Sequence, residues 1–413
     1  MRNVMAVVLA GGQGSRLMPL TLNRAKPAVP FGGKYVIFDF VMSSIINSDV
    51  RKTIILTQYG SQPLIDHIDK FGFSNPFYGS SVRVVPAQMR ISKDWYKGTA
   101  DAVFQNLEFI SREKEISQVA ILAGDHIYNI DLKQMKDFHD GMKSDFTVCA
   151  LVVPSNEAAG NFGVIQVDDK HKIIGFEEKP EKPKEIPGRP GYCFVSMGNY
   201  IVHLDYLTKL LHEDSLNDLS EHDFGKNIIP KIVKSKGNLF AFDFSTNNHS
   251  SYWRDVGRIG QYHAANMDLA SNKPILNLYN ENWPIRTFPD YLPLAKKTRD
   301  YRHVDDPVAP FKNQCKDQNV MLSGGCILDA PLVLEMSIFG RNARVDFGAS
   351  VIESVIFSGV KIGAHAKIVR SIIDEGIIIP EGILIGVNHD EDKERGFEVI
   401  DGITVVPKGY VFK

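Results

Sequence analysis

Residues 4–16 read VMAVVLAGGQGSR, an apolar run that passes directly into a glycine-rich loop. The apolar run Val4–Ala10 predicts a buried β-strand, and the loop Gly11–Arg16 follows at its carboxyl end. Glycines at such a place let the backbone approach a polyphosphate closely and turn its N–H groups toward the phosphate oxygens. The spacing matches neither G-x-G-x-x-G nor G-x-x-x-x-G-K-[ST], so a structural tight turn is the alternative on the glycines alone. Arg16 and Lys26 add positive charge for a phosphate in a transition state, which favours phosphate binding.

The rest of the first 260 residues alternates apolar runs with amphipathic segments. The further strands that we expect are Lys52–Thr57, Ser81–Pro86, Val119–Ala123, Phe146–Val153 and Leu239–Asp243. One amphipathic segment has Thr99 and Asp101 at the start of a helical pattern. Its apolar positions are Val103, Phe104, Leu107 and Ile110. Strands that alternate with helices predict an α/β fold with a mostly parallel sheet, which binds ligands beyond the carboxyl ends of its strands.

The C-terminal part of the chain has apolar residues at a 17-residue period. The three series are Phe339, Ile356 and Ile373, then Val345, Ile362 and Ile379, then Val351, Ile368 and Ile385. A period of this length, with turn-forming residues between the apolar positions, predicts stacked coils in a parallel β-helix; an irregular β domain is the alternative. The proline-punctuated, charged segment 286–315 is interpreted as a linker. The expected domains are therefore 1–285, then this linker, then the β-helix domain 316–413.

The overall composition is that of a soluble enzyme. The chain has 44% hydrophobic residues, 47 basic and 49 acidic side chains, and a net charge of −2. Such a balance gives no general attraction to nucleic acid or to an anionic membrane. The four cysteines, which form no C-x-x-C pair, are expected to be isolated reduced thiols: Cys149, Cys193, Cys315 and Cys326. Without a membrane-spanning run or a cleavable signal, we expect a cytoplasmic protein.

Two aspartates stand in settings that suit a magnesium ion. The run Val119–Ala123 ends in Gly124-Asp125-His126, which places the Asp125 carboxylate at the carboxyl edge of the sheet. Asp255 lies in the distinctive stretch YWRDVG. Mg²⁺ prefers one or two carboxylates together with phosphate oxygens and water, so these acids fit a metal bound to nucleotide phosphates. A helix cap or a turn is the alternative for each aspartate taken alone.

Two other stretches suit a phosphorylated sugar. In FEEKP, residues 176–180, the flexible ammonium of Lys179 suits a phosphate dianion, and a solvated loop is the alternative. In WYKGTAD, residues 95–101, Tyr96 stands beside a helix start, where its hydroxyl suits a sugar or a phosphate. A core aromatic is the alternative for Tyr96.

The pattern Leu-Ala-Gly-Gly-x-Gly-x-Arg-Leu followed by Lys26-Pro27 resembles the signature of the sugar-phosphate nucleotidyltransferases. Further motifs follow in order: RAKPAV, WYxGTADA, AGDHIY, HDFGK, WRDVG, NWPIRT and SGGC. Together they resemble the bacterial glucose-1-phosphate adenylyltransferases, or ADP-glucose pyrophosphorylases, over nearly the whole chain. The resemblance implies a Rossmann-like catalytic domain, a left-handed β-helix domain, a homotetramer and a role in glycogen synthesis.

The resemblance also implies a site, residue by residue. The positions that match glucose 1-phosphate ligands are Tyr96, Gly163, Glu178, Lys179 and Ser196. Those that match the ATP site are Leu9, Ala10, Gly11, Gly12, Gly14, Gln58, Gly98 and Asp125. The implied catalytic residues are Arg16, Lys26, Asp125, Lys179 and Asp255, of which Asp125 and Asp255 match the Mg²⁺ ligands. The implied reaction is ATP plus glucose 1-phosphate giving ADP-glucose and pyrophosphate.

The chain departs from its enteric relatives in the region that the resemblance identifies as allosteric. Asn23 stands where they have Lys, Pro30 where they have His, and Val36 where they have Arg. Activation by fructose 1,6-bisphosphate is therefore not expected, and activation by another glycolytic intermediate is an open alternative. The alternatives for function are a non-catalytic regulatory subunit and a nucleotidyltransferase that uses another NTP or sugar 1-phosphate. An acyltransferase, with His365 as the base within the coils, is a third.

Overall fold

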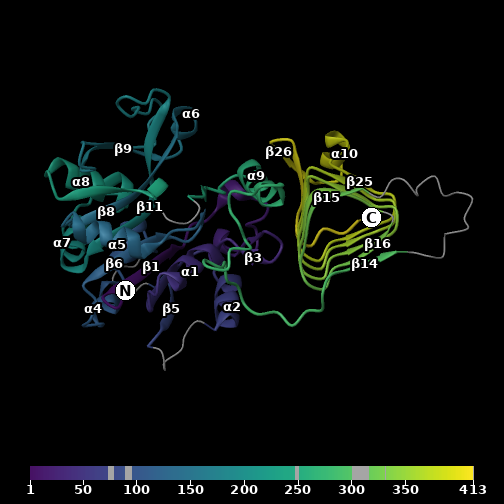
Figure 1. Ribbon diagram of the computed structural model, residues 1–413, viewed down its shortest axis with the longest axis horizontal. Helices are drawn as coiled ribbons and strands as arrows, with labels where there is room; N and C mark the ends of the chain where they lie inside the picture. Colours follow the sequence, from purple (N-terminus) through teal and green to yellow (C-terminus); the bar gives the residue numbers. More distant parts are fainter. Residues whose placement is uncertain (73–78, 89–94, 247–250, 300–315, 331, 413) are drawn as a thin grey trace, which may run out of the picture. The chain divides into compact units, whose positions relative to one another are not determined.

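The computed structural model describes residues 1–413 apart from 73–78, 89–94, 247–250, 300–315, 331 and 413 (Figure 1). The chain forms two compact units, and each of them combines two stretches of sequence. The first unit contains Met1–Gly12 and Phe40–Trp253, and the second contains Gln13–Asp39 and Arg254–Lys413. The glycine-rich loop therefore begins in the first unit and ends in the second. None of the described helices is both long enough and apolar enough to span a bilayer.

The first unit is built on a nine-stranded mixed sheet. Its strands are β1 (Val4–Ala10), β4 (Lys52–Thr57), β5 (Ser81–Pro86), β6 (Gln118–Ala123), β8 (Phe146–Pro154), β9 (Gly163–Val167), β10 (Ile173–Glu178), β11 (Tyr192–His203) and β12 (Leu239–Asp243). β1 pairs in parallel with β4 and β6, and its side chains are buried on both faces of the sheet, which explains why its sequence is apolar throughout. The antiparallel pairs gather around β11, which contacts β6, β8 and β9. The predicted α/β fold is confirmed; its sheet is mixed, and the glycine loop lies at the parallel part, whereas the prediction was a mostly parallel sheet.

Short helices and one further strand complete the first unit. They are α1 (Phe38–Asn47), α2 (Gln62–Phe71), α3 (Thr99–Phe104), α4 (Leu107–Ser111), β7 (Ile127–Tyr128), α5 (Leu132–Gly141), α6 (Ser155–Ala158), α7 (Leu204–Ser215), the π-helix η4 (Phe224–Ile228), α8 (Ile229–Lys234) and the 3₁₀-helix η5 (Phe244–Thr246). The helical pattern from Val103 to Ile110 is two helices, because the chain leaves the helix at Gln105 and Asn106. Asn106 Nδ2 donates to the Ala102 carbonyl at 2.8 Å, and such side-chain bonds to the backbone compete with helix continuation.

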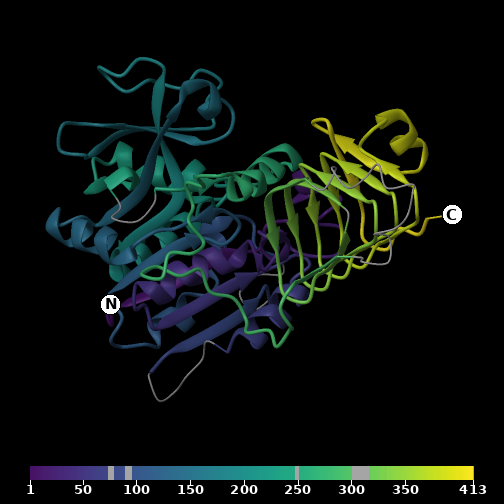
Figure 2. The same cartoon turned by 45° about the vertical axis from the view of Figure 1, so that its right-hand side comes forward.

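The second unit contains the β-helix, whose stacked coils are visible side by side in Figure 2. Its strands are β14 (Lys296–Arg299), β15 (Lys316–Leu322), β16 (Ile327–Ala330), β17 (Val333–Phe339), β18 (Arg344–Val345), β19 (Ser350–Ile352), β20 (Val355–Ile356), β21 (Lys361–Ile362), β22 (Lys367–Val369), β23 (Ser371–Ile373), β24 (Ile378–Ile379), β25 (Leu384–Ile385) and β27 (Ile403–Val406). The predicted period is confirmed residue by residue. Val345 pairs with Ile362, Ile362 pairs with Ile379, and the other two series pair in the same way.

Other elements of the second unit lie outside the coils. They are η1 (Ser15–Leu17), η2 (Lys26–Ala28), the hairpin of β2 (Pro30–Phe31) and β3 (Tyr35–Val36), α9 (Ile259–Ala270), α10 (His389–Glu394) and β26 (Glu398–Ile400). The short β13 (Trp253–Arg254) lies at the unit boundary. Within the expected linker 286–315, the described residues include β14, which pairs in parallel with β16 of the coils.

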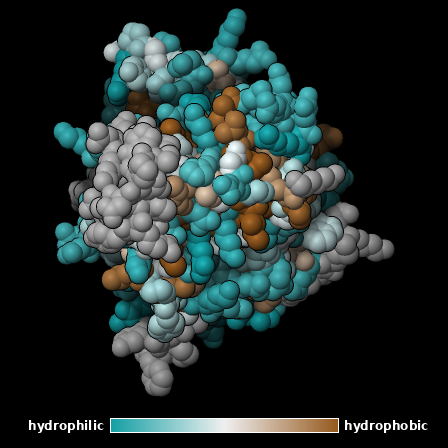
Figure 3. All heavy atoms as spheres, turned by 90° about the vertical axis from the view of Figure 1, so that its right-hand side faces the viewer, coloured by the Kyte–Doolittle hydropathy of each residue, from teal (hydrophilic) through white to brown (hydrophobic). Residues whose placement is uncertain are grey.

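Apolar side chains also reach the surface of the second unit. Figure 3 shows hydrophobic residues among hydrophilic ones on the face that lies at the right of Figure 1. Ile378 and Leu384, on two strands of the last coil, are 62% and 43% exposed. The thiols of Cys149, Cys193 and Cys326 are free and buried, as expected, whereas Cys315 lies outside the described residues.

A ladder of buried serines fixes one corner of the coils. Ser337, Ser354 and Ser371 are 17 residues apart, and each hydroxyl donates to the carbonyl two residues before it at 2.7 Å. The Ser337 hydroxyl also accepts from the Ser354 N–H at 3.2 Å, and the Ser354 hydroxyl accepts from the Ser371 N–H at 3.1 Å. The residue before each serine has a positive φ, so the chain turns sharply there. The hydroxyls thus satisfy backbone groups that a turning coil leaves without strand partners.

Replacement of Ser354 by Ala is expected to lower the free energy of unfolding. The change leaves the buried N–H of Ser371 without its acceptor, which costs on the order of 1–3 kcal/mol. Urea-induced unfolding followed by circular dichroism measures this loss. Ser358→Ala is the matched control, because the Ser358 hydroxyl takes no part in the ladder; equal midpoints for the two variants would contradict the role of the ladder.

A buried histidine makes the stability of the first unit depend on pH. His139 of α5 is fully buried, its Nδ1 lies 2.8 Å from the Thr147 hydroxyl, and its ring lies 4.9 Å from that of His203. Burial, with a smaller effect of His203, lowers the pKa of His139 from 6.5 to about 4. The folded protein therefore keeps His139 neutral at a pH where the unfolded chain binds a proton.

The free energy of unfolding is expected to fall as the pH is lowered from about 6.5 to about 4. In that window the unfolded state binds one proton more at His139, so acid favours unfolding, by on the order of 2–3 kcal/mol in total. Urea titrations at pH 7.5 and pH 5 measure the difference. His139→Leu removes the titrating group, so the variant should lose this part of the pH dependence; a variant as acid-sensitive as the wild type would contradict the prediction.

Candidate functional site

The first part of the glycine loop passes close to the end of β4. Leu9 and Ala10 end β1, and Gly11 follows beside Gln58. A Cβ atom on Gly11 would lie 3.1 Å from the Gln58 Cβ, which is closer than side chains normally pack. A Cβ on Gly12 would meet no atom within 4 Å, so its side is open. The structure therefore brings together the predicted nucleotide residues Gly11 and Gln58, at the carboxyl ends of two adjacent parallel strands.

The second part of the loop packs against the turn that carries Lys26. Gly14 has φ +63°, a left-handed conformation that favours glycine, and a Cβ there would lie 3.0 Å from the Lys26 Cβ. The Thr21 hydroxyl donates to the Gly14 carbonyl at 2.9 Å and closes the turn. Arg16 lies in η1 and is exposed. Gly14 is thus required by conformation as well as by space.

Lys26 and Asp255 form a partly buried ion pair in the second unit. The Lys26 Nζ lies 3.1 Å from the Asp255 Oδ1, and their side chains are 7% and 16% exposed. Lys26 begins the 3₁₀-helix η2, whose next residue, Pro27, fixes the backbone. The sequence predicted roles for both residues but not their contact, which joins positions more than 200 residues apart.

Asp125 lies directly after β6, where neighbouring strands hold the backbone. The Gly124 N–H donates to the Leu9 carbonyl at 2.9 Å, and a Cβ on Gly124 would lie 2.9 Å from Val8 Cγ1. The Asp125 side chain is 36% exposed, and its Oδ1 lies 3.5 Å from the His126 Nε2. The His126 ring packs edge-on against Trp253, with centroids 5.6 Å apart, which agrees with a structural part for this histidine.

A compact group of three predicted sugar-phosphate ligands lies where β9 meets β10. Gly163 and Glu178 are direct partners in the antiparallel register of these strands. A Cβ on Gly163 would lie 2.5 Å from Phe176 Cζ and 2.9 Å from Glu178 Oε2, so a larger residue would displace the Phe176 ring and the Glu178 carboxylate. Lys179 follows with φ +48°, and its Nζ lies 3.7 Å from Glu178 Oε1. Burial raises the pKa of Glu178, although the Lys179 ammonium opposes this shift.

Ser196 lies at an irregularity of the long strand β11. The register of β11 against β8 shifts between Ser196 and Tyr200, and Gly198 there has φ +72°. The Gly198 N–H donates to the Ser196 hydroxyl at 3.2 Å. The Tyr200 hydroxyl also forms a hydrogen bond with Ser196, and burial raises the pKa of Tyr200. β-bulges often re-aim side chains near active sites, so the position suits a ligand contact.

Tyr96 and Gly98 occur where the chain enters α3. The Tyr96 hydroxyl accepts a hydrogen bond from Asn106 Nδ2 at 2.9 Å, and burial raises the pKa of Tyr96. A Cβ on Gly98 would lie 2.3 Å from the His222 carbonyl oxygen, so packing alone requires glycine at this position. These contacts show that Tyr96 and Gly98 contribute to the packing of the first unit. Their roles as ligands of the substrates remain predictions.

Two residues that have no role predicted from the sequence lie beside the group of Gly163, Glu178 and Lys179. A Cβ on Gly225 would lie 2.5 Å from Glu178 Oε2, so this glycine makes room for the carboxylate. Asp223 caps η4 by accepting from the Gly225 and Lys226 N–H groups, and it accepts from the Thr99 hydroxyl at 2.9 Å. Both lie in the motif HDFGK, whose presence was the available signal.

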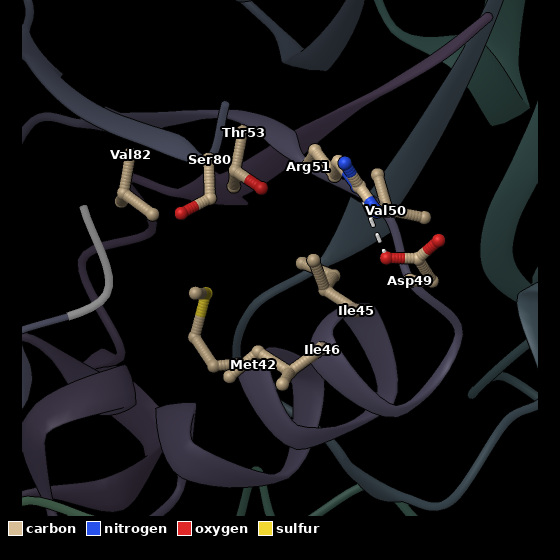
Figure 4. A pocket seen from close by; sticks show the side chains of 9 residues that line it. All are labelled: Met42, Ile45, Ile46, Asp49, Val50, Arg51, Thr53, Ser80 and Val82. Atoms are coloured by element: carbon tan, nitrogen blue, oxygen red, sulfur yellow. Dashed lines mark hydrogen bonds and ion pairs between the residues drawn. The ribbon is translucent and has the colours of Figure 1, made fainter. Parts of the chain in front are cut away.

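A separate cavity of about 300 Å³ opens beside the edge strand β5 (Figure 4). Its lining residues are Met42, Ile45, Ile46, Asp49, Val50, Arg51, Thr53, Ser80 and Val82. Asp49 and Arg51 form an ion pair at 3.2 Å on its rim. This lining contains none of the residues that the sequence assigned to substrates.

Comparison with known proteins identifies the family. The profile of the family described as nucleotidyl transferase matches residues 5–272. A second profile, described as the GlmU-like C-terminal hexapeptide, matches residues 309–406, so the β-helix is left-handed. Proteins named glucose-1-phosphate adenylyltransferase from Shewanella baltica and Shewanella oneidensis are 44% identical to the chain, and one from Shewanella putrefaciens is 45% identical. Each alignment covers 98% of this chain and 95% of the relative. The chain belongs to the glucose-1-phosphate adenylyltransferases within the nucleotidyl transferase family.

Proposed function

We propose that this protein transfers the adenylyl group of ATP to glucose 1-phosphate, which gives ADP-glucose for glycogen synthesis and releases pyrophosphate. The observation that carries this proposal is 44–45% identity, along almost the whole chain, to relatives that bear the name of this activity. The grouping of Gly163, Glu178 and Lys179 supports it, because these residues combine a half-buried acid for sugar hydroxyls with an ammonium for a phosphate.

The sugar phosphate is held by the first unit. The Lys179 ammonium binds the phosphate. The backbone N–H of Lys179 donates to the Phe162 carbonyl at 3.1 Å, which fixes the backbone from which this side chain extends. The Glu178 carboxylate, for which Gly163 leaves room, accepts hydrogen bonds from sugar hydroxyls. Ser196 and Tyr96 supply further hydroxyls to the same ligand.

The nucleotide is held by backbone groups and by positive charge. The proposed nucleotide ligands are Leu9, Ala10, Gly11, Gly12, Gly14, Gln58 and Gly98, and the glycine N–H groups are the proposed donors to its phosphates. Arg16 and Lys26 stabilise the negative charge that develops on the phosphates in the transition state. An oxygen of glucose 1-phosphate attacks the α-phosphorus in line, pyrophosphate leaves, and no covalent enzyme intermediate forms. Catalysis then consists of positioning and charge stabilisation.

Asp125 and Asp255 are the proposed ligands of Mg²⁺. Among the described residues, no group of three or more His, Cys, Asp and Glu side chains is arranged to hold a metal ion. Two carboxylates nevertheless fit Mg²⁺, since this ion completes its coordination with phosphate oxygens and water. When bound, the ion would neutralise charge on the nucleotide phosphates. The Lys26 ammonium beside Asp255 holds that carboxylate in place.

Further proposals concern assembly and regulation. We propose a cytoplasmic homotetramer with a catalytic domain at 1–285, a linker at 286–315 and the β-helix domain at 316–413. Pro30 and Val36 are direct partners in the β2–β3 hairpin, so these two departures from the enteric pattern meet at one place. Assays with glycolytic intermediates at sub-saturating ATP test for effectors, and fructose 1,6-bisphosphate is expected to give no activation.

Pyrophosphate release from each pairing of an NTP with a sugar 1-phosphate tests the proposed reaction. ATP with glucose 1-phosphate is expected to be the best pair for the purified protein. A higher rate with GTP, UTP or another sugar 1-phosphate would show a different substrate. No release from any pair would instead support a non-catalytic subunit.

A further inference from the structure

A buried ion pair ties the segment that carries Lys26 to the β-helix within the second unit. The Arg24 Nη2 donates to Asp374 Oδ1 at 2.7 Å, and the two side chains are 6% and 2% exposed. Asp374 follows β23, and its own N–H donates to the Val406 carbonyl of β27 at 3.0 Å. Glu375 lies 3.6 Å from the same guanidinium. The segment is therefore attached to the stacked coils across 350 positions of sequence.

Only one residue separates this anchor from Lys26. Ala25 is extended, with φ −62° and ψ 149°, and η2 begins immediately after it. The Ala28 N–H donates to the Ala25 carbonyl at 2.9 Å, and the Val29 N–H donates to the Lys26 carbonyl at 3.1 Å. With Pro27 inside this short helix, the backbone between the two charged side chains has little freedom. A displacement of Arg24 is thus passed on to the Lys26 ammonium and its partner Asp255.

Stability alone gives little reason for such a pair. A buried ion pair loses its hydration, and an apolar pair of similar volume often serves a fold equally well or better. Burial raises the pKa of Asp374, although the Arg24 guanidinium opposes this shift, so the carboxylate has a costly environment. The pair supplies what an apolar contact lacks, a short and directional bond that fixes the position of the chain.

We infer that Arg24 is a positioning residue, whose ion pair with Asp374 of the β-helix holds Lys26 and Asp255 in place for nucleotidyl transfer. The inference rests on the proposed function, which gives Lys26 and Asp255 their roles at the nucleotide phosphates and the metal. Arg24 itself has no proposed contact with either substrate. The β-helix thereby supports the reaction, because its Asp374 binds Arg24 and fixes the segment that carries Lys26.

A double-mutant cycle between Arg24 and Lys26 tests the inference. Arg24→Met keeps most of the side-chain volume and is expected to lower kcat about tenfold or more, because small displacements of a catalytic group are costly. The KM for glucose 1-phosphate should stay within about twofold, since Lys179 and Glu178 belong to the first unit. In a Lys26→Met background, Arg24→Met should lower kcat less than about twofold further, because its effect runs through the missing ammonium.

Two additional variants separate positioning from folding. Arg24→Met combined with Asp374→Leu replaces the pair by apolar residues and should keep the thermal midpoint of the wild type while kcat stays low. Arg24→Lys, which retains a charge for Asp374, should recover part of kcat. Arg370→Met is the matched control: it breaks the exposed pair with Glu353 on the same β-helix and should leave kcat unchanged.

The outcomes separate this inference from the proposed function. The positioning role would be overturned if Arg24→Met lowered kcat by the same factor with and without Lys26. It would also be overturned if the Arg24→Met/Asp374→Leu protein were stable and had a normal kcat. A wild-type protein that makes no ADP-glucose would overturn the proposed function instead. An active wild type with a normal Lys26→Met variant would remove Lys26 from its role, and the inference with it.

Discussion

An Asp125→Asn variant is expected to turn over ATP and glucose 1-phosphate on the order of 100-fold or more slowly than the wild type. The amide has the shape of the carboxylate but not its charge, so it weakens the proposed Mg²⁺ site while the surrounding packing stays the same. The backbone there is fixed independently, since the Gly124 N–H donates to the Leu9 carbonyl and the Tyr128 hydroxyl donates to the Ala123 carbonyl, both at 2.9 Å. The lost turnover should therefore report charge rather than a shift of the strand.

Steady-state kinetics at saturating substrates and increasing Mg²⁺ measure this effect. The variant should also need more Mg²⁺ for half-maximal rate, because one carboxylate ligand is missing. Asp137→Asn is the matched control, since Asp137 is an exposed aspartate on α5. A turnover of Asp125→Asn close to that of the control would remove Asp125 from the metal site.

Replacement of Lys179 by Ala is expected to raise the KM for glucose 1-phosphate about 100-fold. Loss of a charge-assisted bond to a phosphate dianion costs roughly 2–3 kcal/mol, and each 1.4 kcal/mol is a factor of ten in affinity. The KM for ATP should change little, because Lys179 acts on the sugar phosphate. Initial rates over a wide range of glucose 1-phosphate concentrations separate KM from kcat.

Lys184 supplies the control for this experiment. It is a nearby exposed lysine, paired with Glu177 at 2.7 Å, and it has no proposed contact with substrate. Lys184→Ala should therefore leave the KM for glucose 1-phosphate unchanged. The same result for Lys179→Ala would assign the phosphate to another residue.

The parts of the fold that local pattern determines were predictable from the sequence. The boundaries of β1, β4 and β12 agree with the apolar runs, because a strand buried in a covered sheet is apolar along most of its length. The boundaries of the edge strand β5 agree as well, although most of its residues are not buried. The coils agree in register because stacking places each apolar residue on the one 17 positions later. The break between α3 and α4 was missed, since it depends on the bonds that the Asn106 side chain forms.

The candidate site was predictable where its chemistry is local in sequence. Glu178 and Lys179 are neighbours, and the Gly-Asp end of β6 follows a recognisable strand. The pairs Arg24–Asp374 and Lys26–Asp255 were not predictable, because hydrophobic periodicity carries no information about which distant charges meet. The place of Gly225 beside Glu178 also depends on tertiary packing.

The serine ladder has a consequence for how this part of the gene can change in length. Ser337 and Ser354 each accept a hydrogen bond from the N–H of the serine 17 residues later, so these bonds join successive coils. Insertion or deletion of one residue within a coil would move every later rung out of line with its neighbour. A change of 17 residues keeps the rungs aligned, so the whole coil is the step by which evolution can lengthen or shorten this region.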